Sequence, residues 1–518
     1  MATNKKQINR WKAFLQQSGK KQDAVNEIKN VPIFTEAART IANGLASGKD
    51  TTFPQFGLLA GIGIAETDSD IVHYNVAAPS SIFICGSQGS GKSHTLSCLL
   101  EDCLLPSVVS ELPHPLTGIV FHYDSFIADN AGSPCEAAFL STQSQIKVRV
   151  LCAPTNVRTI KKTYSRLPKV LVEELRISET DLNTKRMMDL MAVKTGSTMP
   201  LYMQVVKRIL RDLRIQQQAA GSSFSYQEFC RQIDGADLSD GQRAPLEQRL
   251  DTLESFMVKK GTSAGVDWTS KAGQLTIVDM SCPTIDPESA CQLFNICLSL
   301  FLEPDPSTVG RVVALDEAHK YMNNSGEAST LTEQLLSTIR LQRHLGARII
   351  VSTQEPTVSP KLLDLCSITL VHRFTSPEWL KALQKHLAGV SSSSRMIAQA
   401  ASAAAAAATE EEEEDGGNSC SGDEVVQGVS SADSGVDGLT GVLETLTIKA
   451  QGNTEQEAAM SMFGQIVQLR VGEALLFAPN ALLDIQSGVQ PKRLGNGVLK
   501  VRIRARVTED GGRSVMAG

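Results

Sequence analysis

The sequence lacks several features that would place it in a common class of protein. No stretch approaches the roughly 18 consecutive apolar residues of a membrane-spanning helix, and the basic N-terminus has no apolar run typical of a secretory signal. The 11 cysteines are odd in number and form no C-x-x-C pair, which argues against a zinc site and favours free thiols in a reducing compartment. A net charge of −6 excludes a globally basic nucleic-acid binder. We therefore expect a soluble intracellular protein of the cytoplasm or nucleus.

The segment Cys85–Ser97 contains a glycine-rich loop of the form G-x-x-x-x-G-K-[ST]. It follows the apolar run Ile82–Ile84 and precedes a predicted helix over Ser93–Glu101, which is the context that a phosphate-binding loop requires. Glycines let backbone N–H groups converge on phosphate oxygens, the lysine contacts the β- and γ-phosphates, and the serine hydroxyl binds Mg²⁺. The alternative is a Gly/Ser turn with an unrelated lysine. The predicted nucleotide-binding residues are Gly86, Ser87, Gln88, Gly89, Ser90, Gly91, Lys92, Ser93 and His94.

A second apolar run, VVALDEAH, ends in two carboxylates, Asp316 and Glu317. At the end of a strand Asp316 can serve with Ser93 as a Mg²⁺ ligand, and Glu317 can orient and deprotonate a water molecule. The alternative is a surface acidic pair after a core strand. The letters DEAH also suggest a helicase of another superfamily, but the gap from Lys92 is too long, and the arginine-rich motif of those helicases is missing. His319 is then an ordinary residue of the next helix.

Further polar candidates lie close to the ends of the later strands. Gln354 ends the run ARIIVSTQ and could sense the γ-phosphate or position water, as glutamines do in related hydrolases, or be an ordinary polar residue at a strand end. Arg340, Arg343 and Arg373 are candidates for an arginine finger that reaches the ATP of a neighbouring subunit, and a solvated helix face explains the first two equally well. The predicted catalytic set is Lys92, Glu317, Gln354 and Arg343.

Strand and helix patterns alternate along the chain, which favours an α/β fold with a mainly parallel, doubly wound sheet. Ligands of such sheets bind at the carboxyl ends of the strands. We expect strands within 55–78 and at 81–85, 116–124, 146–151, 273–281, 311–316, 347–354, 367–374, 462–479 and 497–507. We expect helices at 8–17, 200–218, 244–259, 287–302 and 331–345.

The chain divides into six segments by composition. Residues 389–437 hold a serine run, an alanine run and the acidic run EEEEED, which repels itself and cannot bury apolar surface. The predicted segments are a polar, poorly packing N-terminal region (1–50), the first part of the core with the P-loop, or Walker A motif (51–154), a mainly helical insertion (155–265), the second part of the core with the acidic Walker B pair (266–388), a disordered acidic and alanine-rich insert (389–437), and C-terminal strands that complete the core (438–518).

One local surface carries concentrated positive charge. In LKVRIRARV the four cations Lys500, Arg502, Arg504 and Arg506 alternate with apolar residues, so a strand would place all four on one face. Such a face could track a phosphate backbone, pair with the acidic insert, or be the wet face of an edge strand that charge keeps from aggregating. No aromatic residue interleaves with these cations, so base stacking is not indicated.

The order of these motifs resembles the HerA/FtsK superfamily of P-loop ATPases. GSQGSGKS, QLTIVDMS, LDEAHKY, RHLGARIIVSTQEP and LRVGEALLF follow one another over about residues 80–388 and 462–507, and the later motifs look like the HerA branch, including uncharacterised fungal proteins. The resemblance implies a RecA-like core, a homo-oligomer that is often a hexameric ring, and ATP-driven movement of nucleic acid or polypeptide. By motif position it also implies the roles given above for Lys92, Ser93, Asp316, Glu317 and Gln354, with Arg343 matching only loosely.

The chain departs from that pattern in three ways: residues 1–80 contain no recognisable N-terminal barrel, the acidic insert is extra, and the chain as a whole is not basic. We therefore expect an ATPase with Mg²⁺ as cofactor that drives a motor. The alternatives are a nucleotide-dependent switch or scaffold with slow or no turnover, and a small-molecule kinase. The acidic pair and Gln354 favour hydrolysis over kinase chemistry, and the absence of a guanine-recognition motif favours ATP over GTP.

Overall fold

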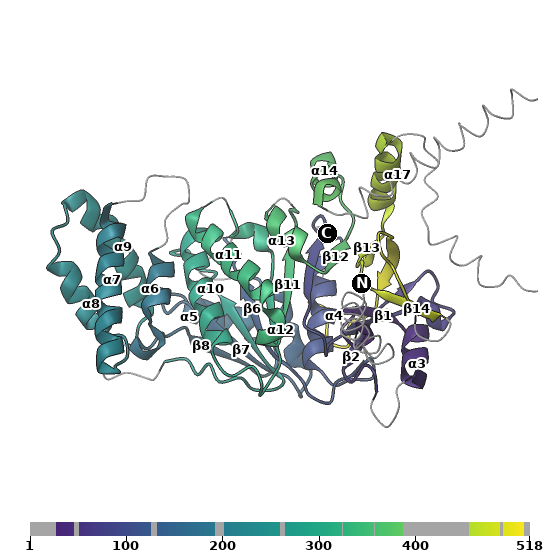
Figure 1. Cartoon of the computed structure of the whole chain (residues 1–518), viewed down its shortest axis with the longest axis horizontal. Coiled ribbons are helices and arrows are strands. Elements are labelled where there is room, and N and C mark those ends of the chain that lie inside the picture. The colour runs from purple at the N-terminus through teal and green to yellow at the C-terminus, as the bar shows by residue number, and fades with distance from the viewer. Residues whose placement is uncertain are drawn as a thin grey trace, which may run out of the picture.

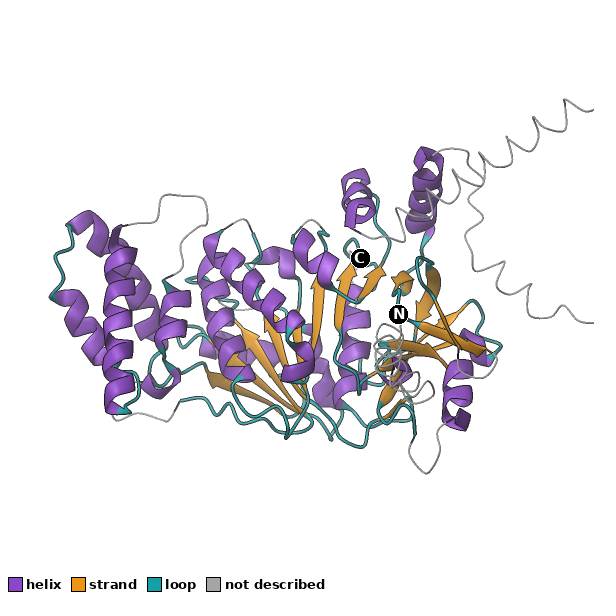
Figure 2. Cartoon of the chain, in the orientation of Figure 1, coloured by secondary structure: helices purple, strands orange, loops and turns teal. Residues whose placement is uncertain are grey.

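A computed structural model describes residues 27–45, 51–125, 132–191, 201–258, 265–323, 325–356, 358–386, 455–486 and 490–511. The predicted helix at 8–17 and the predicted disordered insert at 389–437 lie outside these ranges. One large mixed sheet forms the centre of the molecule, with helices packed on both faces, and α7, α8 and α9 extend beyond its β8 end (Figure 1, Figure 2). The predicted α/β class with a mostly parallel sheet is confirmed.

The parallel half of the sheet carries the predicted core strands. Its strand order is β12-β4-β11-β10-β6-β9-β7-β8, and every neighbouring pair is parallel. The bounds are β4 Ser81–Cys85, β6 Thr117–His122, β7 Lys147–Cys152, β8 Val170–Glu174, β9 Gln274–Asp279, β10 Arg311–Leu315, β11 Ala347–Thr353 and β12 Ile368–Val371. The strands β4, β6, β9, β10, β11 and β12 are buried along their whole length, as continuous apolar runs under two helical layers require.

The register of this half brings three strand ends to one level. Cys85 of β4 pairs with Thr353 of β11, and Val351 of β11 pairs with Leu315 of β10. The loops that follow β4, β10 and β11 therefore leave the sheet side by side at its carboxyl edge.

The remaining strands form a mainly antiparallel half that continues the sheet from β12. Its order is β13-β16-β2-β3-β1-β14-β15, with β5 paired to β2, and β1 and β14 are parallel. The bounds are β1 Ile33–Thr35, β2 Phe56–Ile62, β3 Ile71–Asn75, β5 Ser110–Glu111, β13 Glu473–Phe477, β14 Leu482–Gln486, β15 Gln490–Arg493 and β16 Leu499–Ile503.

Two large apolar cores lie on the two faces of the sheet. One contains the inner face of α4 with Leu96 and Leu100, and the other contains α10, α11 and the helices α6 to α9, which group at one end of the molecule (Figure 1). The bounds are α3 Glu36–Leu45, α4 Lys92–Leu104, α5 Val157–Tyr164, α6 Thr184–Leu190, α7 Leu201–Ala220, α8 Tyr226–Asp234, α9 Asp240–Phe256, α10 Pro287–Leu302, α11 Gly326–Arg340, α12 Gln342–Leu345, α13 Pro360–Leu365, α14 Pro377–His386 and α17 Glu455–Gln468. Short 3₁₀ turns are η1 Asp68–Asp70, η2 Glu136–Thr142, η3 Glu179–Asp181 and η4 Ala318–Lys320.

Two sequence-based expectations about these elements were wrong. The run 462–479 was expected to be all strand, but α17 occupies its first part, because Met462, Ile466 and Leu469 are buried at the three- and four-residue spacing of a helix. The region 1–50 was expected to pack poorly. Its described part instead contributes β1 and α3, and Phe34 stacks on Phe53 with ring centroids 3.9 Å apart.

Candidate active site

The glycine-rich loop connects the buried strand β4 to α4 and is shaped by three glycines in left-handed or nearby positive-φ conformations. The φ angles are +153° at Gly86, +72° at Gly89 and +112° at Gly91, which side chains rarely permit. Inside α4 the first backbone bond runs from the Thr95 N–H to the Gly91 carbonyl. The N–H groups of the preceding first turn are therefore unused by the helix and available to an anion at its N-terminus.

Lys92 is the first residue of α4 and lies over the loop. Its Nζ donates to the Ser87 carbonyl at 3.1 Å. Burial lowers the pKa of the Lys92 amine, while the nearby carboxylates of Glu317 and Asp316 raise it in part. The Ser90 hydroxyl also donates to the Ser87 carbonyl, at 2.7 Å. The loop is thus closed by hydrogen bonds to the Ser87 carbonyl, and the Lys92 amine lies close enough to Asp316 and Glu317 to interact with their charges.

The other predicted loop residues differ in exposure and direction. Gln88 and Gly89 are exposed at the tip of the loop, and Ser93 is half-buried in the first turn of α4. The His94 ring contacts the Arg504 carbonyl through Nε2 at 2.8 Å. This side chain is therefore engaged by the C-terminal segment, so that only the backbone N–H of His94, and not its ring, is available to an anion at the N-terminus of α4.

Asp316 follows β10 directly and is buried within a polar cluster. Its Oδ2 lies 3.2 Å from His122 Nδ1 and 3.7 Å from the Cys135 sulfur, so these ligand-type atoms lie within 4.8 Å of one another. Burial would raise the pKa of Asp316, but the hydrogen bond and charge of His122, with Lys320 and Cys135, lower it overall. Asp316 is therefore held as a carboxylate.

The surroundings of Asp316 are compatible with Mg²⁺. Its second oxygen, Oδ1, is buried and has no hydrogen-bond partner among the described residues. A buried carboxylate oxygen without a partner is costly, and oxygen is the ligand that Mg²⁺ prefers. Asp316 is thus a residue that could hold the ion, and the Ser93 hydroxyl in the first turn of α4 is the other ligand that the loop motif predicts.

Glu317 has an unusual backbone conformation at the same strand end. Its φ and ψ are +47° and +48°, which is left-handed, and non-glycine residues adopt this only when the surrounding structure enforces it. Its Oε2 accepts a hydrogen bond from Gln354 Nε2 at 3.0 Å. The structure therefore brings together two of the predicted catalytic residues, from the ends of β10 and β11.

His319 also reaches this pair, a contact that sequence reasoning missed. Its Nδ1 lies 3.3 Å from Glu317 Oε2 and 3.4 Å from the Gln354 backbone nitrogen. Nδ1 can donate to the carboxylate only when it carries a proton, and it can accept from the N–H only when it does not. Burial lowers the pKa of His319 although Glu317 and Glu355 oppose this, so we favour the neutral ring that accepts from Gln354.

The underside of the loop is supported by residues far away in the sequence. His372, at the end of β12, is fully buried, with Nε2 2.9 Å from the Thr95 hydroxyl and Nδ1 2.9 Å from the Glu473 carbonyl. A Cβ at Gly86 would lie 2.7 Å from the Cβ of His372, and a Cβ at Gly91 would lie 3.0 Å from the Gly472 nitrogen. The two loop glycines are thus needed for close packing as well as for backbone conformation, and no local sequence pattern marked His372.

The candidate arginines lie in different places. Arg343 belongs to α12, which precedes β11, so it lies at the amino edge of the sheet and not with Glu317 and Gln354. Arg340 ends α11 on the same side of β11. Arg373 is next to the loop, where its carbonyl accepts hydrogen bonds from the backbone and hydroxyl of Ser87. Within one chain, the structure does not bring Arg343 to the site; a finger role would require a second subunit.

The expected face of four cations is not formed. The strand β16 ends at Ile503, and only Lys500 and Arg502 are exposed on it. Arg504 is buried and paired with Glu101 at 2.7 Å and Asp102 at 2.9 Å on α4. Because β16 lies between β13 and β2, the interpretation as an edge strand is also wrong.

Arg506 completes the correction. It lies beyond β16 and pairs with Glu136 of η2 and, at 3.5 Å, with Asp510. The alternation of charge in the sequence was therefore misleading: the chain leaves the strand after Ile503, and the last two arginines tie the C-terminal segment to α4 and η2.

No family model matches, and no curated protein matches. Among solved structures, VirB4 of Thermoanaerobacter pseudethanolicus is similar at a TM-score of 0.49 and 12% identity, over 89% of this chain and 99% of that one. The plasmid coupling protein TrwB in complex with ADP and Mg²⁺ is similar at 0.38 and 12% identity, over 68% and 82%. These neighbours are P-loop ATPases of the HerA/FtsK kind that the motif order resembles. Because both TM-scores lie below 0.5, no ligand or role is transferred from them.

Within the part of the chain that the structure describes, no helix combines the length and the apolar character needed to cross a bilayer.

Proposed function

We propose that this chain binds Mg-ATP at the β4–α4 loop and hydrolyses it, using Glu317 as the general base. The observation that carries the proposal is the left-handed Glu317 at the carboxyl end of β10, whose carboxylate accepts a hydrogen bond from Gln354 and interacts electrostatically with Lys92 of the phosphate cradle. A phosphate loop alone explains binding. Hydrolysis also needs a group that can activate water. Glu317, with its strained backbone and its hydrogen bond from the Gln354 amide, lies at the same edge of the sheet as the loop and provides that group.

The roles of the chain's residues follow from this geometry. The loop N–H groups and Lys92 hold the β- and γ-phosphates. Asp316 and Ser93 would hold Mg²⁺, which would neutralise the charge that develops on the phosphates. Gln354 orients Glu317 and the attacking water. Glu317 takes a proton from that water while the water oxygen bonds to the γ-phosphorus. The bond between the γ-phosphorus and the bridging oxygen breaks, which gives ADP and inorganic phosphate.

The work done with this energy is proposed to be movement of a polymer, nucleic acid or polypeptide, by a homo-oligomer. The support is the order of motifs shared with HerA/FtsK ATPases. Because the four cations do not share one face of β16, this strand does not favour nucleic acid over polypeptide as the polymer. The kinase alternative has no observation in its favour.

The test compares ATP turnover and ATP binding for the purified wild type and three variants. Lys92→Ala is expected to weaken ATP binding by about 100-fold, since a buried charge-assisted phosphate contact is lost. Glu317→Gln keeps the shape and is expected to bind ATP normally but turn over at least ~100-fold more slowly. Glu66→Gln, on an exposed turn between β2 and β3, is the matched control and is expected to behave as wild type.

Two further measurements separate the motor from the switch. Solution mass with nucleotide reports oligomerisation, and turnover is repeated with single- and double-stranded DNA, RNA and an unfolded polypeptide. Stimulation of an oligomer by one polymer supports the motor and identifies its substrate class. Wild-type turnover by Glu317→Gln would refute the assignment of the base, and tight ATP binding by a monomer without turnover would favour the switch or scaffold.

A further inference from the structure

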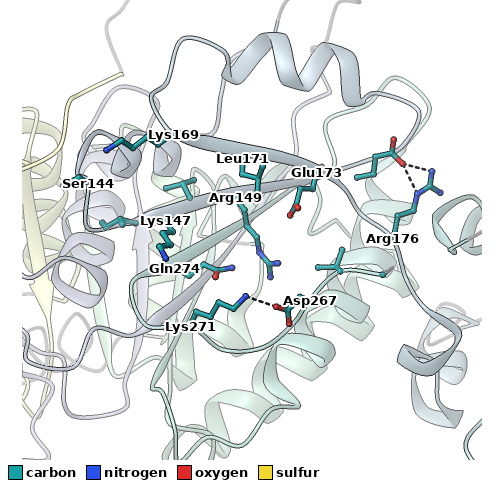
Figure 3. A pocket seen from close by; sticks show the side chains of 15 residues that line it. Ser144, Lys147, Arg149, Lys169, Leu171, Glu173, Arg176, Asp267, Lys271 and Gln274 are labelled. Atoms are coloured by element: carbon teal, nitrogen blue, oxygen red, sulfur yellow. Dashed lines mark hydrogen bonds and ion pairs between the residues drawn. The ribbon is translucent and has the colours of Figure 1, made fainter. Parts of the chain in front are cut away.

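A cavity lies away from the P-loop, at the end of the sheet formed by β7 and β8. Its volume is about 850 Å³, and it is lined by the starts of β7 and β9, by the edge strand β8 and by the segment 265–271 (Figure 3). Lys147 is the first residue of β7 and Gln274 is the first of β9. Because the P-loop leaves the carboxyl end of β4, which is parallel to these strands, the two sites share no residue.

The cavity exists because the sheet face is only partly covered there. On β7, Lys147, Arg149 and Leu151 share one face. Leu151 is buried in the helical core, but Lys147 is exposed and Arg149 only half-buried. Figure 3 shows Lys147 and Arg149 directed toward the segment that carries Asp267 and Lys271. We call this cavity the β7–β8 pocket.

The charges of the β7–β8 pocket do not balance. Its lining contains five cations and three carboxylates. Two of the cations are neutralised, since Arg176 pairs with Glu174 at 2.7 Å and Lys271 pairs with Asp267 at 2.7 Å. The remaining charged groups are Lys147, Arg149, Lys169 and Glu173, none of which has an ion pair among the described residues. The pocket therefore carries an excess of positive charge.

Arg149 is positioned in advance for an anion. Its Nε donates to the Thr276 hydroxyl at 2.8 Å, and its guanidinium lies over the Trp268 ring, 5.9 Å from the centroid. No other side-chain hydrogen bond of Arg149 occurs within the described ranges, so its two terminal nitrogens remain for a ligand. A guanidinium held on one edge offers a planar fork that matches phosphate or carboxylate oxygens.

Lys169 contributes a second, independent observation. It precedes β8 at the rim of the pocket with φ = +56°, and in the described part of the chain only Ala65 and Glu317 are other non-glycine residues with positive φ. Such a conformation is strained for a residue with a side chain and tends to occur at functional sites. The same strain marks the proposed catalytic base, which makes its occurrence at an unpaired lysine of the pocket informative.

We propose that the β7–β8 pocket binds a small molecule that carries phosphate groups. The unpaired cations and the fork of Arg149 suit phosphate oxygens, and the exposed Leu171 with Ile146 and Val266 offers an apolar wall for the rest of the ligand. The volume is in the range of small-molecule sites. A nucleotide and a simple phosphate compound share this chemistry. The proposal goes beyond ATP hydrolysis, because it concerns a site that shares no residue with the P-loop.

The test removes the P-loop contribution first. Full-length Lys92→Ala protein is titrated calorimetrically at low salt with pyrophosphate, with AMP and with a single-stranded oligonucleotide, each in a separate experiment. Adding Lys147→Ala and Lys169→Ala in this background is expected to weaken pyrophosphate binding at least about tenfold, since two phosphate contacts are lost. Both lysines are exposed, so folding is not at risk. Lys161→Ala with Lys162→Ala, exposed on α5, is the matched control and is expected to bind as the parent does.

Each outcome is decisive for the pocket. Tighter binding of AMP than of pyrophosphate, lost in the pocket variant, identifies a nucleotide site; equal binding identifies a phosphate site. Unchanged affinity in the pocket variant, or no saturable binding of either probe, overturns the proposal. Pocket-dependent binding of a single-stranded oligonucleotide alone would assign the surface to a polymer and overturn the small-molecule class. These titrations measure binding in a variant with a disabled P-loop and do not require ATP turnover. A negative result would therefore overturn the pocket proposal without bearing on the proposed ATPase activity.

Discussion

The parallel and antiparallel halves of the sheet contribute differently to the phosphate-binding loop. The parallel strands β4, β10 and β11 end at one level and present the groups with proposed chemical roles, including Lys92, Glu317 and Gln354. The antiparallel half contributes packing. Its Gly472 backbone N–H donates to the Ser90 carbonyl, and the Glu473 carbonyl contacts His372 beneath the loop.

A third contact of the antiparallel half reaches the helix behind the loop. Beyond β16, Arg504 binds Glu101 and Asp102 of α4, and the Thr508 backbone and hydroxyl both donate to Glu101. The comparison shows that the parallel half carries the residues with proposed chemical roles, whereas the antiparallel half stabilises the loop and α4. Substitutions in the parallel half should change turnover, whereas substitutions in the antiparallel half should change the stability of the loop and of α4.

The largest expected effect tests the supporting half. Arg504→Met removes one partner of a buried ion pair and leaves two carboxylates on α4 without their cation. Loss of one member of such a pair costs ~3–5 kcal/mol of unfolding free energy. Arg502→Met, at an exposed position of β16 two residues earlier in the chain, should change stability by less than ~0.5 kcal/mol. Chemical denaturation measures both, and equal small losses would contradict the division between the halves.

A pH effect should come from the histidine at the junction of the halves. Burial lowers the pKa of His372 to about 4, with Lys92 and His94 adding to this and the Glu473 carbonyl opposing it. An unfolded histidine has a pKa of about 6.5, so between these values the unfolded chain binds a proton that the folded chain does not. The stability from the neutral ring is present above pH 6.5 and is lost as the pH falls toward 4, by ~3 kcal/mol in total.

The measurement is the unfolding free energy between pH 7 and 4.5. His372→Gln should be less stable at pH 7 because its contacts are disturbed, but its loss of stability on acidification should be smaller than that of the wild type. His114→Gln, at an exposed position, should keep the wild-type slope. If His372→Gln retained the full slope, His372 would not be the group that titrates.

The smallest expected effect tests the chemical half. Gln354→Ala removes the amide that donates to Glu317, and one lost hydrogen bond of about 1.4 kcal/mol corresponds to a tenfold lower kcat. The unfolding free energy should stay close to that of wild type, in contrast to Arg504→Met. Steady-state ATP turnover with a denaturation curve on the same sample checks both. A loss of stability without loss of kcat would reverse the role assigned to this strand end.

Much of the chemistry was accessible from the chain itself, because it depends on groups that are close together in the sequence. The loop from Gly86 to Ser93 is continuous, and Asp316 and Glu317 are adjacent at the end of an apolar run. The long buried strands were also predicted, since parallel strands covered on both faces read as continuous apolar runs. The predictions were wrong where the apolar spacing fitted both a helix and a strand, as in α17. They were also wrong where the alternation of charges continued beyond the end of the strand, as at Arg504 and Arg506.

The sequence by itself determined that a glycine-rich loop of the phosphate-binding form and an acidic pair exist and that each follows a strand of an α/β sheet. Only the tertiary structure decided that β11 lies between β4 and β10, which places Gln354 on Glu317 and leaves Arg343 at the other edge. It also decided that His372 and Gly472 support the loop. The physical reason is that strand order and register depend on how all the apolar faces pack at once, so contacts between residues hundreds of positions apart carry no local signal.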